Sequence, residues 1–252
     1  MKNLFYKTIC ICISFSFVYA DDCLSEKSTY CLLKNHPHHI YLGPEAFWCD
    51  LSIHIKNCKI NGKKGFLGIR AGYEYLKPKA FYVGVDLLSA GSNKGFDGES
   101  AEYYCQNSSN AGFGNFEIRL GYAFARENLI LTPFLGVGGY ALGNNGPCFH
   151  FHESMVYYAA GMRSVVELNH FFNLGLNWKI FRIDDAERKI EYLLREYAEF
   201  DNTWGCEIGV PFIWRLGSSK RWDIQLEPYF LKLAFSELQN IYGTRLLFGY
   251  RI

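Results

Sequence analysis

The sequence predicts an all-β fold, a transmembrane antiparallel up-and-down β-barrel of eight to ten strands, with ten the best estimate. Three observations predict it. Apolar and polar residues alternate along one segment after another, which is the period of strands with two different faces. Aromatic residues make up 17% of the chain and glycines number 24, a composition that favours strands over helices. Short and long connections alternate between the segments.

The first residues have the features of an export signal. Two lysines precede an apolar stretch over residues 9–18, and small residues end at Ala20 before acidic positions. A stretch of this length is too short to span a bilayer and is typical of a cleaved secretory signal. We predict a signal peptide over 1–20, a periplasmic leader over 21–39 and one barrel domain over 40–252.

Alternation is clearest over residues 115–124. Phe116, Ile118 and Leu120 share one face there, and Glu117 and Arg119 lie on the other. The remaining segments with the same pattern are 45–56, 66–76, 80–90, 129–142, 156–168, 171–181, 204–216, 222–230 and 241–252. Together they predict ten strands.

Short connections are expected at 77–79, 125–128, 169–170 and 217–221, and longer loops at 57–64, 91–111, 143–155 and 184–202. Short turns at one rim, beside the termini, and long loops at the other are typical of an outer-membrane barrel. Within the last long loop, Asp184 with Glu187 resembles a helix capping box, and apolar residues follow at three- and four-residue spacing. This loop is therefore predicted to hold one short amphipathic helix that covers the barrel mouth or packs on neighbouring loops.

The bulk of the apolar face decides which face is outside. Roughly five large apolar side chains per strand could not fit the lumen of a small barrel, so they are placed in lipid. Charges of both signs on the other face can pair inside, whereas an Arg or Lys facing mid-bilayer costs about 2–4 kcal/mol. The predicted lumen network comprises Arg70, Glu74, Glu117, Arg119, Arg163, Glu167, Glu207, Arg215, Asp223, Glu227 and Arg245. Tyr and Trp at strand ends, such as Tyr73, Tyr75, Trp222 and Tyr250, are expected to form interfacial girdles.

At this point the chain resembles small outer-membrane β-barrel proteins of Gram-negative-type envelopes, similar to the outer membrane protein A transmembrane-domain class. The C-terminal segment carries part of the likeness, because Gly243, Leu246, Phe248, Tyr250 and Ile252 resemble the signal read by the barrel-assembly machinery. The last residue departs from the usual Phe. The resemblance implies an outer-membrane location, with membrane lipid, the assembly machinery and a host or surface ligand at the long loops as partners.

Nine cysteines less the two in the predicted signal leave seven, in an oxidising compartment. Cys23 with Cys31 is a candidate disulfide, and Cys58, Cys105 and Cys148 lie in three loops of one rim, where one bridge is expected. Cys49 is interpreted as a small lipid-facing residue. An odd number leaves at least one thiol unpaired or bridged to another chain.

No metal site or cofactor is expected. His36, His38 and His39 surround Pro37 without a carboxylate or Cys at ligand spacing, so they are interpreted as a flexible polar leader. The candidates for a catalytic site are His150, His152, Asp184 and Asp185, by analogy with omptin proteases, which place His and Asp residues near the rim. The simpler interpretation is that these four are polar residues of solvent-exposed loops.

Charge limits the function classes. The chain has 26 basic and 25 acidic residues, which leaves no basic surplus for a nucleic-acid binder. We expect a non-enzymatic outer-membrane protein that supports the envelope or presents surface loops. The alternatives are a hydrolase at the extracellular rim and a narrow passive channel.

Overall fold

The fold was determined as a computed structural model. The structure describes residues 29–55, 58–93, 97–100, 104–105, 110–126, 128–145, 150–191, 195–199, 203–234 and 238–252. The predicted signal peptide and most of the predicted leader lie outside these residues.

The described chain is almost entirely strand. Its elements are α2 (Thr29–Asn35), β1 (His38–Ile55), β2 (Cys58–Leu76), β3 (Phe81–Ser92), β4 (Asp97–Ser100), β5 (Tyr104–Cys105), β6 (Asn110–Tyr122), β7 (Phe124–Arg126), β8 (Leu129–Asn145), β9 (His150–Asn169), β10 (Phe172–Glu191), β11 (Arg195–Glu199), β12 (Thr203–Gly209), β13 (Phe212–Leu216), β14 (Trp222–Ala234) and β15 (Leu238–Arg251). Among these residues, no helix is both long and apolar enough to cross a bilayer.

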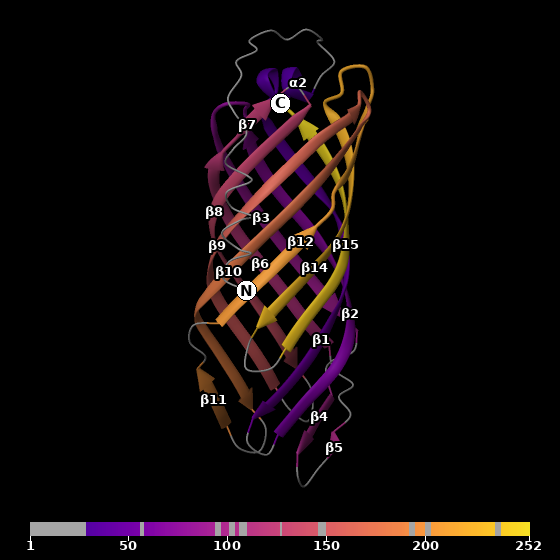
Figure 1. Ribbon diagram of the computed structural model, residues 1–252. Coiled ribbons are helices and arrows are strands. Elements are labelled where there is room, and N and C mark those ends of the chain that lie inside the picture. The colour runs from indigo at the N-terminus through magenta and orange to yellow at the C-terminus, as the bar shows by residue number, and fades with distance from the viewer. Residues whose placement is uncertain are drawn as a thin grey trace.

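The strands form one closed antiparallel barrel (Figure 1). Each long strand pairs with its neighbour in sequence, and β1 closes the ring by pairing with both β2 and β15. β7 continues β6, and β13 continues β12 after a break at Pro211, so the ring has ten strand positions. The predicted fold class and the strand number of ten are confirmed.

The two ends of the barrel differ. The end with the tight turns also holds α2 and the C-terminus, and we call it the short-turn end (Figure 1). The β4–β5 hairpin and β11 project from the opposite end, which we call the hairpin end. Several strands continue into the segments that were predicted as long loops. For example, residues 58–64 of the loop predicted over 57–64 belong to β2, where Cys58 pairs with Ile55 of β1.

The helix predicted within 184–202 is wrong. β10 continues to Glu191 along β9, with Ile190 opposite Phe151, and β11 pairs antiparallel with the same end of β10. Pairing on both sides of an extended strand satisfies more backbone groups than an isolated two-turn helix would, and it overrides the local spacing of apolar residues. The short helix that the structure describes is α2, in the segment predicted as leader.

Exposure follows the predicted assignment of faces. The outer wall is apolar, with Phe81, Leu135 and Leu67 exposed by 77%, 69% and 67%. Inward carboxylates such as Glu45 and Glu74 are exposed by 0% and 2%. The large apolar side chains therefore surround the barrel, and charged groups lie inside it.

The lumen is not uniformly polar, however. It contains three layers, which differ in chemistry along the barrel axis. At the short-turn end, Leu33 of α2 packs with an apolar group, the capping layer, made of Leu76, Tyr82, Ala123, Ile130 and Phe134. A charged layer follows, and toward the hairpin end an aromatic layer crosses the lumen. The aromatic layer includes Phe47, Phe66, Phe113, Tyr140, Tyr157 and Phe181.

Glycines in the wall make room for the inward rings. Tyr157 lies directly opposite Gly138 on the neighbouring strand, and Tyr229 lies opposite Gly243. A Cβ added to either glycine would stand 2.6 Å from the facing tyrosine ring. Each ring thus lies flat across the adjacent strand, which lets a narrow barrel hold several aromatic side chains in one layer.

We expect Gly138→Val to destabilise the barrel by about 1–3 kcal/mol, because the added side chain overpacks the Tyr157 ring. Gly112→Val is the matched control, since a Cβ there meets nothing within 4 Å. Urea unfolding in detergent micelles measures the difference. Equal stability of the two variants would contradict the packing described here.

Candidate functional site

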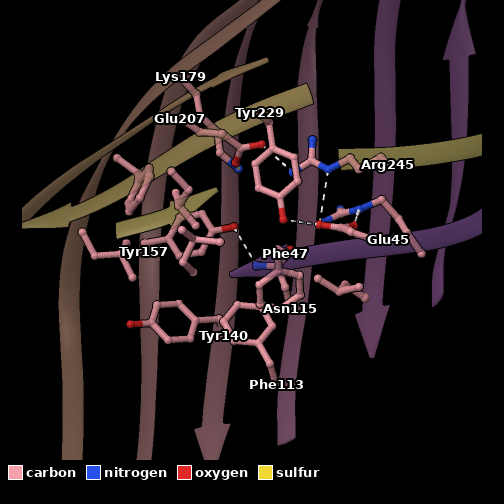
Figure 2. A pocket seen from close by; sticks show the side chains of 16 residues that line it. Glu45, Phe47, Phe113, Asn115, Tyr140, Tyr157, Lys179, Glu207, Tyr229 and Arg245 are labelled. Atoms are coloured by element: carbon pink, nitrogen blue, oxygen red, sulfur yellow. Dashed lines mark hydrogen bonds and ion pairs between the residues drawn. The ribbon is translucent and has the colours of Figure 1, made fainter. Parts of the chain in front are cut away.

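The charged layer is centred on Glu45, a carboxylate that is fully buried on β1. Its Oε2 accepts a hydrogen bond from Arg70 Nε at 2.5 Å, and its Oε1 accepts one from Tyr229 OH at 2.5 Å. Arg245 Nε lies 3.5 Å from the same Oε1 atom. Figure 2 shows Glu45 between Tyr229 and Arg245, with Phe47 and Phe113 of the aromatic layer below. One carboxylate therefore joins strands β1, β2, β14 and β15.

Lys179 makes a second junction beside it. Its Nζ contacts Glu117 and lies 3.0 Å from Glu207 Oε2. Glu207 Oε1 also accepts a hydrogen bond from Arg245 at 2.6 Å, and Tyr157 OH donates to Glu117 at 2.7 Å. The ion pairs therefore continue from β15 through β12 and β10 to β6.

The layer continues toward the short-turn end around Glu74 and Asp86. Arg163 donates to Glu74, and Arg119 donates to Asp86. Arg70 Nη1 lies 3.2 Å from Asp86 Oδ1, which connects this part of the layer to Glu45. Charged groups on nearly every strand position thus belong to one connected network.

His39 lies at the edge of this network. Its Nε2 is 3.0 Å from Asp223 Oδ2, and its Nδ1 is 3.8 Å from Glu74 Oε2. Arg251 Nε approaches Asp223 from the other side at 3.8 Å. His39 therefore lies between the carboxylates of β14 and β2.

The layer is close to charge balance. Its carboxylates are Glu45, Glu74, Asp86, Glu117, Glu207, Asp223 and Glu227, and its cations are Arg70, Arg119, Arg163, Lys179, Arg245 and Arg251. Burying ions out of water is costly unless each has partners of opposite charge and hydrogen bonds. Tyrosines supply many of the remaining bonds, because Tyr82, Tyr157 and Tyr229 each donate to one of these carboxylates.

Most of the predicted lumen residues lie in this layer, and two lie elsewhere. Glu167 and Arg215 are at the short-turn end, where both contact Thr29 of α2. Sequence reasoning missed Glu45, Asp86, Lys179 and His39 as network members. The sequence pattern could have identified them, because each occupies an inward-facing position of a strand with alternating apolar and polar residues.

The helix α2 seals the short-turn end. Thr29 donates from its backbone nitrogen and its hydroxyl to Glu167 Oε2, at 2.6 and 2.5 Å. Leu33 packs into the capping layer, and the Leu76 amide donates to the Pro37 carbonyl as the chain enters the barrel. The segment interpreted as a flexible polar leader is thus ordered from Thr29 onward. Its His38 and His39 belong to β1. The alternation of exposed and buried side chains along that strand begins with them, since His38 is exposed and His39 is buried.

The cysteines differ from the sequence interpretation. Cys31 is in a disulfide bond. Cys23 and Cys148 lie outside the described residues, so the proposed pairings stay predictions. The interpretation of Cys49 as lipid-facing is wrong: its side chain is in the lumen, exposed by 0%, and its Sγ accepts a hydrogen bond from Gln239 at 3.2 Å. Cys206 is a free thiol on the exposed face of β12.

The four rim candidates do not form a cluster among the described groups. His152 pairs with Lys189, and Asp185 pairs with Val156, so the two are separated by four residues, roughly 13 Å along the strand. His152 and Asp184 are exposed on the outer face, next to inward residues Glu153 and Ile183. His150 is opposite Glu191, at the far end of the hairpin. Within the described ranges, no group of three metal-binding side chains comes together.

The C-terminal strand shows what the proposed assembly signal does in the folded barrel. Phe248 and Ile252 are exposed on the outer wall, and the Tyr250 ring lies 4.5 Å from Trp222 between centroids. Leu246 is half-buried. Gly243 faces inward, beneath the Tyr229 ring. The predicted contact with the assembly machinery remains a prediction.

The space left in the lumen is small. One cavity of about 30 Å³ lies between the charged and aromatic layers, and another of about 40 Å³ lies within the charged layer beside His39 and Arg163. Each volume suits only a few water molecules. Neither of these two cavities is large enough for an organic ligand.

No protein-family model and no curated protein matches the chain. Solved structures do resemble it. The outer membrane protease OmpT from Escherichia coli shares 9% identity over 85% of this chain and 96% of that chain, with a TM-score of 0.64. The transport unit of the autotransporter AIDA-I from Escherichia coli shares 8% identity over 98% and 97%, with a TM-score of 0.47. Ail from Yersinia pestis shares 12% identity over 85% and 97%, with a TM-score of 0.39.

The likeness to OmpT shows the fold of the protein: a closed antiparallel β-barrel of the kind found in outer-membrane proteins. At 9% identity it shows no shared activity. The other two resemblances are too distant to add to this conclusion.

We expect Glu45→Gln to destabilise the barrel by about 3–5 kcal/mol, because the neutral amide leaves two buried guanidinium groups without their counter-charge. Asp184→Asn is the control, since it removes one carboxylate from the exposed outer face. Urea unfolding of both variants in detergent provides the measurement. A Glu45→Gln barrel within about 0.5 kcal/mol of the parent would show that the network does not hold the strands together.

Proposed function

We propose that the protein is an outer-membrane β-barrel with a sealed lumen, which supports the envelope and presents its hairpin end at the cell surface. The observation that carries this proposal is the lumen: three successive layers fill it, with a helix across one mouth. An apolar outer wall around a closed ring supports a membrane location, because closure leaves no strand edge unpaired in lipid.

A passive channel is the alternative that the lumen argues against. An ion would have to pass α2 and the capping layer, then a balanced charged layer, then the packed rings of the aromatic layer. Phe47 stacks on Phe66 with 5.0 Å between centroids, and Phe113 stacks on Tyr140 at 5.5 Å. The cavities between these layers, of about 30 and 40 Å³, provide no continuous water column.

The hairpin end supports a role in contact with a surface partner. The β4–β5 hairpin and β11 extend the sheet beyond the ring (Figure 1). Extended hairpins hold their backbone in paired strands, so they offer a partner a defined surface without the entropy cost of ordering a free loop. In this orientation the short-turn end faces the periplasm, where the assembly machinery acts.

We further propose that the barrel is not a hydrolase. His152 and Asp184 face outward on the barrel wall, where the two share no cleft. A general base must lie within hydrogen-bond reach of the water that it activates, with a second group to orient it. A peptide-cleavage assay with the refolded barrel tests this part of the proposal, and turnover that His152→Ala abolishes would overturn it.

We expect the purified mature chain to require detergent and to migrate faster on a gel before boiling than after it, because the closed barrel stays compact in the unboiled sample. Detergent removal is expected to precipitate the protein, because the apolar wall is exposed. A chain that stays monodisperse in buffer alone would exclude the membrane barrel.

We expect the refolded barrel to show no stepwise conductance in planar lipid bilayers. A variant that lacks residues 29–35 is expected to stay closed as well, because the charged and aromatic layers still fill the lumen. A known open porin in the same bilayers verifies the detection of single channels. Ohmic current steps from the parent chain would overturn the sealed lumen, and steps from the deletion variant alone would show that α2 is the barrier.

A further inference from the structure

The cavity within the charged layer is lined by residues that carry unpaired polar atoms. Its volume is about 40 Å³, and Glu74, Arg163 and Asn177 are among its lining residues. Glu74 Oε2, Arg163 Nε and Asn177 Oδ1 are buried, and none of these atoms makes a hydrogen bond within the described part of the chain. Glu74 and Arg163 are exposed by only 2% and 7%. Three buried atoms on the wall of one small space therefore need a partner.

The direct contacts of the same residues use their other polar atoms. Arg163 Nη1 donates to Glu74 Oε1, and Asn177 Nδ2 donates to Glu227 Oε1 at 2.8 Å. His39, which also lines the cavity, has its Nδ1 3.8 Å from Glu74 Oε2, too far for a direct hydrogen bond. Each residue is thus held in place by existing contacts, with a further polar atom left for a ligand.

The three residues come from different sides of the ring. Glu74 is on β2, Arg163 on β9 and Asn177 on β10. In the order of strands, β3, β6 and β8 separate β2 from β9. A ligand in the cavity would therefore join nearly opposite walls of the barrel.

The unpaired atoms specify a ligand that both donates and accepts hydrogen bonds. An ionised Glu74 and the Asn177 carbonyl oxygen are acceptors, whereas the Arg163 guanidinium is a donor only. The donation from Asn177 Nδ2 to a carboxylate fixes which end of that amide carries the oxygen. Water is the small molecule that satisfies all three atoms, because it donates twice and accepts twice.

An ion fits this set of groups less well than water. A bound anion would lie beside the cavity carboxylates, which are Glu74, Asp86 and Glu227. A bound cation would lie beside the cavity guanidinium groups, which are Arg70, Arg119, Arg163 and Arg245. Since both signs surround the same small space, a neutral ligand avoids repulsion from either set.

The cavity of about 30 Å³ provides a contrast within the same lumen. Its lining includes several aliphatic side chains, namely Leu88, Leu231, Leu233 and Ile241. No buried side-chain nitrogen or oxygen of its described lining residues is without a hydrogen-bond partner. Cavities remain dry where they are apolar and hold ordered water where buried polar groups need partners. The two cavities should therefore differ in water content.

We propose that the cavity beside Glu74 and Arg163 is a water-binding site whose water molecules complete the charged layer. A volume of about 40 Å³ holds about three water molecules. They accept from Arg163 Nε, donate to Glu74 Oε2 and Asn177 Oδ1, and connect β2 with β9 and β10. These water molecules are part of the folded structure, in the same way as the ion pairs around them.

A crystal structure of the full mature chain, refolded in detergent, tests the site directly. We expect electron density for water within about 3.2 Å of Glu74 Oε2, Arg163 Nε and Asn177 Oδ1. Crystals soaked in sodium bromide and in rubidium chloride are expected to show no anomalous peak in the cavity. A bromide or rubidium peak there would assign the site to an ion and overturn the proposal. An empty cavity, or direct bonds among these three side chains, would overturn it too.

Oxygen-17 relaxation dispersion of water provides a second measurement, because it detects water molecules that stay bound for longer than the barrel takes to tumble. The variant Leu247→Phe places a larger side chain in this cavity, and Leu88→Phe does the same in the other. Both leucines are buried, with 5% and 6% exposed. We expect Leu247→Phe to lose the signal of about three bound water molecules and Leu88→Phe to retain it.

An equal signal from Leu247→Phe and the parent would place the bound water elsewhere and overturn the site. If Leu247→Phe does not refold, the crystals of the parent chain and their two ion soaks still decide the question. The inference goes beyond the proposed role at the cell surface and depends only on the geometry of the lumen. Conductance in planar bilayers would contradict the sealed lumen without removing the water molecules, and a dry cavity would leave the sealed lumen intact.

Discussion

Closure of the ring is the constraint on which the rest of this structure depends. In a barrel of ten strands the inward side chains of opposite walls meet, so every inward position must be satisfied by another wall. β1 completes the ring by pairing with both β2 and β15, and Glu45 is buried on this strand. The buried carboxylate then finds partners on both sides of the closure, in Arg70 and Arg245. Closure and charge pairing therefore stabilise each other.

The layers of the lumen follow from this constraint. Charged groups occupy the central part, where strands from all sides supply opposite charges and tyrosine hydroxyls. Rings fill the part toward the hairpin end, where glycines such as Gly138 let them lie across a neighbouring strand. α2 covers the remaining mouth. Each layer removes space for water in a different way, and the combination explains why the cavities stay as small as about 30 and 40 Å³.

Much of this fold could be predicted from the sequence, because alternation of period two reports directly on which face of a strand is apolar. The same pattern predicted the inward positions of Glu74 and Glu117. It failed where inward positions are themselves apolar: Phe47 and Cys49 follow the alternation of β1 yet belong to the lumen. It also failed for 184–202, because lateral pairing with β9 outweighs helical spacing. The contacts of Glu45 with residues on the last two strands depend on closure, which no local pattern encodes.

The position of Glu45 also has a consequence for how the chain acquires its structure. Its partner Arg245 is 200 residues away in sequence, so the central contact of the network cannot form until the first and last strands meet. Contacts between such distant residues form slowly, because closing the long intervening loop costs conformational entropy before the contact contributes any stabilisation. Until then the arginines and carboxylates of the intermediate strands lack their full set of partners. Maturation of this barrel should therefore be concerted and slow, with the polar interior completed in the same step that joins the two ends of the sheet.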